Sequence, residues 1–270
     1  MKWPKHQMNV ISKLQCVLGI SDENSKKNIS GMVRQAKILV TSWIALTMIL
    51  MPSMLYGQTS PEADEAVYEA SSNIVYIMMG PSNSIAVIDL DKGEVIGSIP
   101  AEGNPHGGAL TPDGNRIYTA SMNTERMSVV DTKSSEVITK IDLGAISHHT
   151  AIRPDGRYVY AAAGELKVID TATNEVIESI KTPESPFYPV ISPDGSTLYV
   201  LSSGTSISVI NTETHTLTDK FEMGSKSMMG HLALTTDGET LIATNDMEGK
   251  LSVIDAASGK LRSTIPVGKQ

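Results

Sequence analysis

Four of the five histidines that follow residue 57 recur at one place in a repeated pattern, and imidazole nitrogens can act as ligands. They are His106, the adjacent pair His148 and His149, and His231. Each lies five or six residues before a Pro-Asp-Gly or Thr-Asp-Gly turn, where a strand is expected to begin. Neutral imidazoles bind copper, zinc, iron or nickel, and they also donate and accept hydrogen bonds. The spacing therefore predicts a set of ligand-type side chains at the starts of several strands.

The two residues at this place differ from copy to copy, while the rest of the pattern is repeated. The five pairs, in chain order, are Glu65 and Ala66, His106 and Gly107, His148 and His149, Phe187 and Tyr188, and Gly230 and His231. Positions that vary within a repeat are better candidates for a specific site than positions that every copy shares. We therefore predict a ligand-binding set made of His106, His148, His149, Phe187, Tyr188 and His231.

A metal or haem site is the sharper interpretation of the same histidines. Met228 and Met229 precede His231 closely and add thioether donors, and histidine with methionine favours copper or haem. The structural interpretation is that these methionines fill gaps in a core poor in aromatic residues, and that the histidines bond neighbouring backbone. Alternation along a strand places the side chains of adjacent residues on opposite faces. It therefore puts His106 and His148 on one face, and His149 and His231 on the other.

The elements that position these residues form a repeat of about 40 residues. The Asp or Asn markers Asp89, Asp131, Asp170, Asn211 and Asp255 are spaced 42, 39, 41 and 44 apart. Each copy consists of four short runs rich in Val, Ile and Tyr, separated by Gly, Asn, Asp and Pro, and no helical period occurs after residue 60. Four antiparallel strands in a period of about 40 residues are typical of a β-propeller blade. The recurrent Asp and the Pro-Asp-Gly turns are interpreted as parts of blade construction.

The segments "SVID", "TATNEVI", "SPDGSTLYV" and "IPVG" resemble the YVTN-type β-propeller repeats of exported prokaryotic proteins, over roughly residues 66–267. Propellers related to this family include amine dehydrogenase heavy chains, the cytochrome d1 haem domain and lactonase-like proteins. The resemblance implies an all-β propeller of five four-stranded antiparallel blades, each running from an inner to an outer strand. Because such relatives more often have about seven blades, a partial form of a seven-bladed propeller is the alternative. A propeller by itself implies no chemistry.

The first 57 residues differ from the rest. Arg34 and Lys37 precede an apolar run over about residues 38–51, which a polar stretch follows, and this order is typical of a secretory signal. We expect residues 1–57 to be an N-terminal extension plus signal peptide, with a start at Met1 or Met32, and residues 58–270 to be the propeller domain. The location is then periplasmic or extracellular. The alternative is a membrane anchor formed by the uncleaved segment.

Composition excludes several classes of function. The single cysteine, Cys16, lies in the segment expected to be removed, so disulfides, Cys-zinc sites and Cys nucleophiles are excluded from the mature chain. From Gln58 onward, 15 Lys and Arg face 28 Asp and Glu. This acidic balance excludes a nucleic-acid partner, which requires clustered cations.

We therefore expect a binding or scaffold protein rather than an enzyme. It would present the mouth of the propeller's central channel, where the inner strands begin, to a protein partner or small ligand. The first alternative is a periplasmic copper- or haem-binding protein associated with redox chemistry. The second is a lactonase-like hydrolase, which would need carboxylates beside the histidines, and only Glu65 is placed for that role. No cofactor is required by the sequence.

Overall fold

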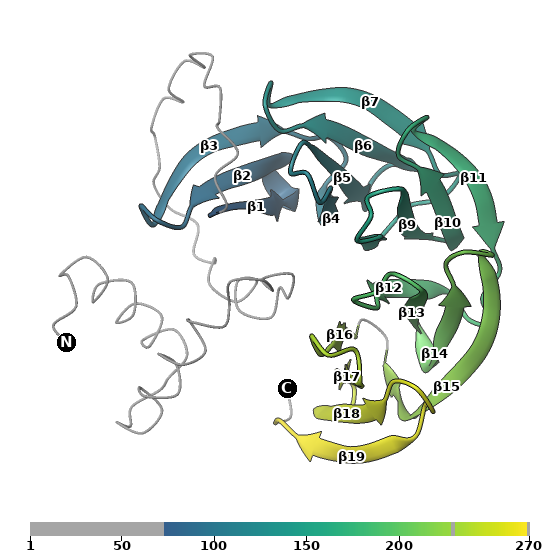
Figure 1. Cartoon of the computed structure of the whole chain (residues 1–270). Helices are drawn as coiled ribbons and strands as arrows, with labels where there is room; N and C mark the ends of the chain where they lie inside the picture. The colour runs from purple at the N-terminus through teal and green to yellow at the C-terminus, as the bar shows by residue number, and fades with distance from the viewer. Residues whose placement is uncertain (1–72, 228–229, 269–270) are drawn as a thin grey trace, which may run out of the picture. The chain divides into compact units, whose positions relative to one another are not determined.

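The structure is a computed structural model, and it describes residues 73–227 and 230–268. Five antiparallel sheets follow one another along the chain (Figure 1). The first consists of β1 (Ile74–Met79), β2 (Ser84–Asp89) and β3 (Glu94–Pro100), with a short 3-10 turn, η2 (Gly80–Ser82), between β1 and β2. The strand predicted near Ala66, which would complete this sheet, lies outside the described residues.

The other four sheets each have four strands. The second consists of β4 (Pro105–Leu110), β5 (Arg116–Ser121), β6 (Arg126–Asp131) and β7 (Glu136–Asp142), and the third of β8 (Thr150–Ile152), β9 (Tyr158–Ala163), β10 (Glu165–Asp170) and β11 (Glu175–Ile180). The fourth consists of β12 (Pro186–Ile191), β13 (Thr197–Ser202), β14 (Gly204–Asn211) and β15 (Thr216–Ser227), and the fifth of β16 (Leu232–Leu234), β17 (Thr240–Asn245), β18 (Lys250–Asp255) and β19 (Leu261–Pro266).

The first strands of the four-stranded sheets lie at the centre. Strand β4 packs on β8, β8 on β12, and β12 on β16, while β7, β11 and β15 are outermost in their sheets (Figure 1). Radial sheets that meet through their first strands form a β-propeller. The predicted fold is confirmed, and the sheets are called blades 1 to 5 below.

The repeated turn residues build the blades, as the sequence predicted. The side chain of Asp131 accepts hydrogen bonds from the backbone N–H groups of Lys133 (2.9 Å) and Ser134 (2.8 Å). In the Pro-Asp-Gly turn of blade 2, Asp113 accepts from Thr111 Oγ1 at 2.6 Å, and Gly114 takes a φ of 73°. A φ in this range is strained for a residue with a side chain, which explains the glycine. These aspartates are therefore structural.

Hydrophobic side chains fill the space between successive blades. Each blade has a forward face, directed at the next blade along the chain, and a backward face, directed at the preceding one. Tyr118, Tyr160 and Tyr199 lie on the forward faces of blades 2, 3 and 4. Their hydroxyls donate to the next blade: to Asn174 Oδ1 at 2.7 Å, to the carbonyl of Thr212 at 3.3 Å and to the carbonyl of Ala256 at 3.0 Å. The interfaces are thus apolar with one polar contact near the outer hairpin.

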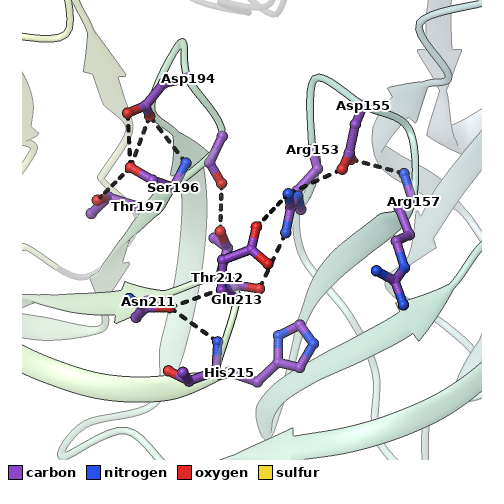
Figure 2. Close-up of polar contacts among 12 residues, drawn as sticks. Arg153, Asp155, Arg157, Asp194, Ser196, Thr197, Asn211, Thr212, Glu213 and His215 are labelled. Atoms are coloured by element: carbon purple, nitrogen blue, oxygen red, sulfur yellow. Dashed lines mark hydrogen bonds and ion pairs between the residues drawn. The ribbon is translucent and has the colours of Figure 1, made fainter.

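An ion-pair cluster joins blades 3 and 4 beside the Pro-Asp-Gly turn of blade 3 (Figure 2). Arg153 stands where blades 2, 4 and 5 carry Thr111, Ser192 and Thr235. Its Nη2 lies 3.0 Å from Asp155 Oδ2, within the same turn, and 2.7 Å from Glu213 Oε1 of blade 4. The Arg153 side chain is only 12% exposed, so its charge depends on the carboxylates that lie beside it.

Replacing Glu213 by Gln is expected to destabilise the protein by roughly 1 kcal/mol, because the buried guanidinium loses one of its two anionic partners. The value is small for a buried cation because the Glu213 carboxylate is 65% exposed and screened by water. Urea unfolding measures the change. The matched control is Glu248→Gln, which removes an exposed pair with Lys250 and is expected to cost almost nothing. Equal losses in the two variants would contradict this account.

Within residues 73–227 and 230–268, no helix is long and apolar enough to cross a membrane. The segment predicted as a signal peptide, over residues 1–57, lies outside the described part of the chain.

Candidate functional site

The six predicted ligand residues lie at the starts of the inner strands of four blades. His106 is the second residue of β4, and His148 and His149 directly precede β8. Phe187 and Tyr188 belong to β12, and His231 directly precedes β16. These six residues are called the mouth cluster: His106, His148, His149, Phe187, Tyr188 and His231.

Backbone hydrogen bonds fix the histidines of blade 3. The N–H of His148 donates to the carbonyl of Ala162 at 3.1 Å, and the N–H of Ala162 donates to the carbonyl of His149 at 3.0 Å. Both His148 and His149 thus bond to Ala162, so two residues face one and the β8–β9 pairing is irregular at this end. In blade 5, the N–H of Thr244 donates to the carbonyl of His231 at 2.8 Å. The histidine backbones therefore belong to the sheets and not to loose connections.

Irregular pairing changes the direction of two of the side chains. The register between β4 and β5 shifts between Pro105 and Gly108, and that between β12 and β13 shifts between Pro186 and Tyr188. An extra residue in one strand breaks the alternation of side chains and re-aims them. His106 and Phe187 lie in these irregular stretches.

His149 is the centre of the mouth cluster. Its ring centroid lies 4.8 Å from that of His106, 4.2 Å from Tyr188 and 5.8 Å from His231. The ring of Phe187 contacts both His148, at 4.7 Å, and His149, at 5.4 Å. Side chains of blades 2, 3 and 5 therefore meet through His149. Opposite faces of neighbouring blades are directed at each other, so the contact between His106 and His149 is compatible with alternation.

Burial keeps the imidazoles neutral. The pKa of His149 is lowered to about 2, first by burial and then by repulsion from His106, His231 and His148. Burial also lowers the pKa of His106, against a hydrogen bond to the His148 backbone that raises it. The pKa values of His148 and His231 are lowered by burial in the same way, followed by the effect of His106. The cluster therefore carries no charge at neutral pH.

Several polar atoms of the cluster are buried without a hydrogen-bond partner. They are Nδ1 of His106, Nδ1 of His148 and Nε2 of His149, and Oγ1 of Thr150, the next residue along, is in the same state. Buried polar groups in folded proteins normally have a partner, so each exception needs an explanation. A ligand or ordered water at the mouth would supply the partner.

Close approach of blades 2 and 3 depends on a glycine. A Cβ added at Gly107 would lie 2.8 Å from the carbonyl oxygen of His148 and 2.9 Å from Cα of His149. Both contacts are with backbone, which cannot move aside as a side-chain end can. Because Gly107 has no side chain, blade 2 approaches blade 3 closely enough for His106 to contact His149.

The described residues show no metal-coordinating arrangement at the predicted metal site. In the described segments, no group of three or more His, Cys, Asp or Glu side chains could hold a metal ion as they stand. Met228, Met229 and Glu65 lie outside the described residues. The proposed copper or haem ligation and the carboxylate of the hydrolase hypothesis therefore stay predictions.

Sequence reasoning missed one hollow of the surface. It has a volume of about 450 Å³ and lies on blade 2, where Glu102, Arg126, Lys140 and Asp142 are among its lining residues. Lys140 forms an ion pair with Glu102 across it. These residues come from the connection before β4, from the start of β6 and from the outer strand β7, so no spacing pattern in the sequence predicted that they line one hollow. The mixed charges are exposed and partly paired, and they point to no particular chemistry.

Comparison with known proteins agrees with the fold. A family model described as YNCE-like beta-propeller matches residues 62–155. The Kuenenia stuttgartiensis hydrazine synthase structure has a TM-score of 0.57 at 18% identity, covering 73% of this chain and 84% of that chain. The β-propeller domain of Myceliophteria thermophila Cps50 (Swd1) has a TM-score of 0.61 at 12% identity, covering 72% and 68%. No curated protein matches the sequence. Identities this low show the fold alone, and the comparisons therefore support a β-propeller.

Proposed function

We propose that the protein is an exported binding protein whose mouth cluster takes an uncharged, hydroxyl-bearing small ligand or the equivalent group of a partner protein. The β-propeller fold supports a binding or scaffold role in general. The observation that carries the specific proposal is the set of buried ring nitrogens without partners on His106, His148 and His149. They lie next to the rings of Phe187 and Tyr188.

The surroundings favour an uncharged ligand. The burial that lowers the pKa of His149 to about 2 disfavours any cation held by charge alone. No Lys or Arg belongs to the cluster, so an anion would enter without compensation. A neutral imidazole offers one donor and one acceptor, and a hydroxyl can satisfy both.

A metal ion is the second candidate, and one observation favours it. The rings of His106, His149 and His231 come from three blades. The centroid of the His149 ring lies 4.8 Å from that of His106 and 5.8 Å from that of His231. Imidazoles without thiolates suit copper or zinc, which coordinate neutral nitrogen and so do not require a charged site. Because the rings do not form a metal-binding group as they stand, they would have to rotate to converge on one ion.

Titration calorimetry with three probes tests the proposal: glucose for hydroxyls, acetate for an anion and tetramethylammonium for a cation. We expect glucose to bind and both ions to fail. In a His149→Phe variant, which keeps a ring but removes both nitrogens, glucose binding is expected to weaken about tenfold or more. The matched control is His215→Phe, because His215 packs on Tyr158 in an outer hairpin, away from the mouth.

Elemental analysis and an absorption spectrum of the purified protein separate the two candidates. The binding proposal expects neither stoichiometric metal nor a chromophore. Copper, zinc or haem that is lost in a His148→Phe, His149→Phe double variant would establish the second candidate instead. Binding of acetate or tetramethylammonium with no response to glucose would overturn the choice of an uncharged ligand.

Export is part of the proposal, supported by the basic start at Arg34 and Lys37 and the apolar run that follows. Amino-terminal sequencing of protein from the periplasm is expected to begin near Gln58. A mature chain that retains residues 38–51 would contradict cleavage and favour the membrane-anchored alternative.

A further inference from the structure

Every contact between neighbouring blades 2 to 5 uses the same two faces. The forward face of blade 4 packs Tyr199 and Val209 against Leu241 and Ile254 on the backward face of blade 5. Blades 2 and 3, and blades 3 and 4, pack through the equivalent residues. At this interface Tyr199, Val209, Leu241 and Ile254 are almost fully buried, at 8% exposure or less.

The backward face of blade 1 has the same apolar character but is incompletely covered. Val75 and Ile88 occupy the register of Leu241 and Ile254, and they pair with each other as those residues do. Leu241 and Ile254 are fully buried, whereas Val75 and Ile88 are only half-buried. Leu90, in the turn that follows β2, is 56% exposed.

The forward face of blade 5 is incompletely covered in the same way. Ile242 and Val253 occupy the register that Tyr199 and Val209 have in blade 4, and both are half-buried. Leu251 on β18 is also half-buried, and Ile265 of β19, paired with Leu251, is 46% exposed. The first and last described blades therefore present two apolar faces of complementary type.

Each of the two faces differs from the other blades at one position, and the two positions correspond to the two partners of a hydrogen bond between blades. Where blades 2, 3 and 4 place a tyrosine that donates to the next blade, blade 5 has Ile242, which has no hydroxyl. The backbone carbonyl that accepts the tyrosine bond belongs to Thr212 in blade 4 and Ala256 in blade 5. The corresponding residue in blade 1 is Leu90. If blade 5 met blade 1, an apolar contact between Ile242 and Leu90 would replace the hydrogen bond.

We propose that the forward face of blade 5 binds the backward face of blade 1 on a second copy of this chain. The contact continues the register of the established blade-to-blade interfaces. Among the described strands, none of β1–β3 packs on β16–β19 as neighbouring sheets pack on one another (Figure 1). Meeting within one chain would reopen interfaces that are already fully buried, while meeting between copies leaves them unchanged. Such a head-to-tail contact either closes into a ring of copies or extends as a chain.

Mixing two single-cysteine proteins tests the proposal. One copy carries Leu90→Cys and the other Ile242→Cys, each in a full chain with Cys16→Ser, and a short bis-maleimide joins cysteines that lie close together. We expect Leu90→Cys and Ile242→Cys proteins to cross-link about tenfold or more faster than Leu90→Cys and Ile177→Cys proteins. The reason is that association of the two faces raises the local concentration of the two cysteines. Ile177 is similarly exposed, at 46%, but lies on outer strand β11.

The doubly substituted chain distinguishes the alternatives. If Leu90→Cys and Ile242→Cys in one chain join within the monomer, the ring closes on itself and the proposal is wrong. Cross-linking no faster than with the Ile177→Cys control, in both experiments, would show that something else covers the faces and would also overturn it.

A substitution on the face gives an independent readout. Leu251→Lys is expected to raise the dissociation constant of self-association about tenfold or more, measured by sedimentation over a range of concentrations. Ile177→Lys is expected to leave it unchanged. Equal association of the Leu251→Lys and Ile177→Lys proteins, with circular dichroism showing both folded, would contradict the proposed interface.

Discussion

Lowering the pH from 6.5 to 4.5 is expected to reduce the free energy of unfolding by about 2 kcal/mol through His149 alone. In the unfolded chain this imidazole takes up a proton near pH 6.5, whereas in the folded protein its pKa is about 2. Between these values the unfolded state binds more protons, so stability is complete above pH 6.5 and falls as the pH falls. The slope is about 1.4 kcal/mol per pH unit for one such group.

Urea unfolding at half-unit steps between pH 7 and pH 4.5 measures this effect. The interval from pH 6.5 to 5 is the cleanest, because carboxyl groups titrate below it, and structural ones such as Asp113, with a pKa of about 2, titrate far below it. A His149→Phe variant is expected to lose much of the slope there. The remaining slope comes from His106, His148 and His231, whose pKa values burial also lowers. An unchanged slope in His149→Phe would contradict the account.

Replacing Gly107 by Ala is expected to destabilise the protein by about 2 kcal/mol and to loosen the mouth cluster. The added Cβ would lie 2.8 Å from the His148 carbonyl oxygen and 3.0 Å from Nδ1 of His149. Blade 3 would have to move away from blade 2, so water would reach His149 and its pKa would rise. Thermal unfolding measures the stability, and the pH dependence of unfolding reports the pKa.

The neighbouring glycine provides the matched control. At Gly108 the added Cβ would meet the terminal Cε of Met78 at 2.5 Å, and a flexible methionine can move aside. Gly108→Ala is therefore expected to cost less and to leave the pH dependence unchanged. If both substitutions cost the same and neither changes the pH dependence, close backbone approach at Gly107 is not what assembles the cluster.

The fold could be predicted from the sequence because the pattern of one four-stranded blade recurs five times. Asp131 and Asp113 recur as turn residues in nearly every copy, and the structure shows that they hold backbone N–H groups. Departures from the repeat were equally informative, since the residues that vary at one place became the mouth cluster. Arg153, which replaces a hydroxyl residue, escaped notice because its partner Glu213 comes from another blade.

The contacts within the cluster could be predicted from alternation only in part. Counting residues placed His106 and His149 on opposite faces, and because opposite faces of neighbouring blades meet, their ring centroids lie 4.8 Å apart. His106 lies in the irregular stretch between Pro105 and Gly108, and the proline and glycines that mark this stretch in the sequence do not specify how the irregularity directs the side chain. Burial of the rings is likewise a property of the assembled blades, which depends on how closely blades 2 and 3 approach at Gly107.

Long-range proton–nitrogen spectra of the imidazoles, recorded at pH 5 with and without glucose, test the central claim most directly. We predict a neutral ring for His149 at this pH, because its pKa is lowered to about 2. We also predict that glucose shifts the signals of the buried nitrogens, above all Nε2 of His149, and leaves His215 unchanged. A doubly protonated His149 ring at pH 5 would contradict its burial in the cluster, and ring signals indifferent to glucose would contradict a ligand site there.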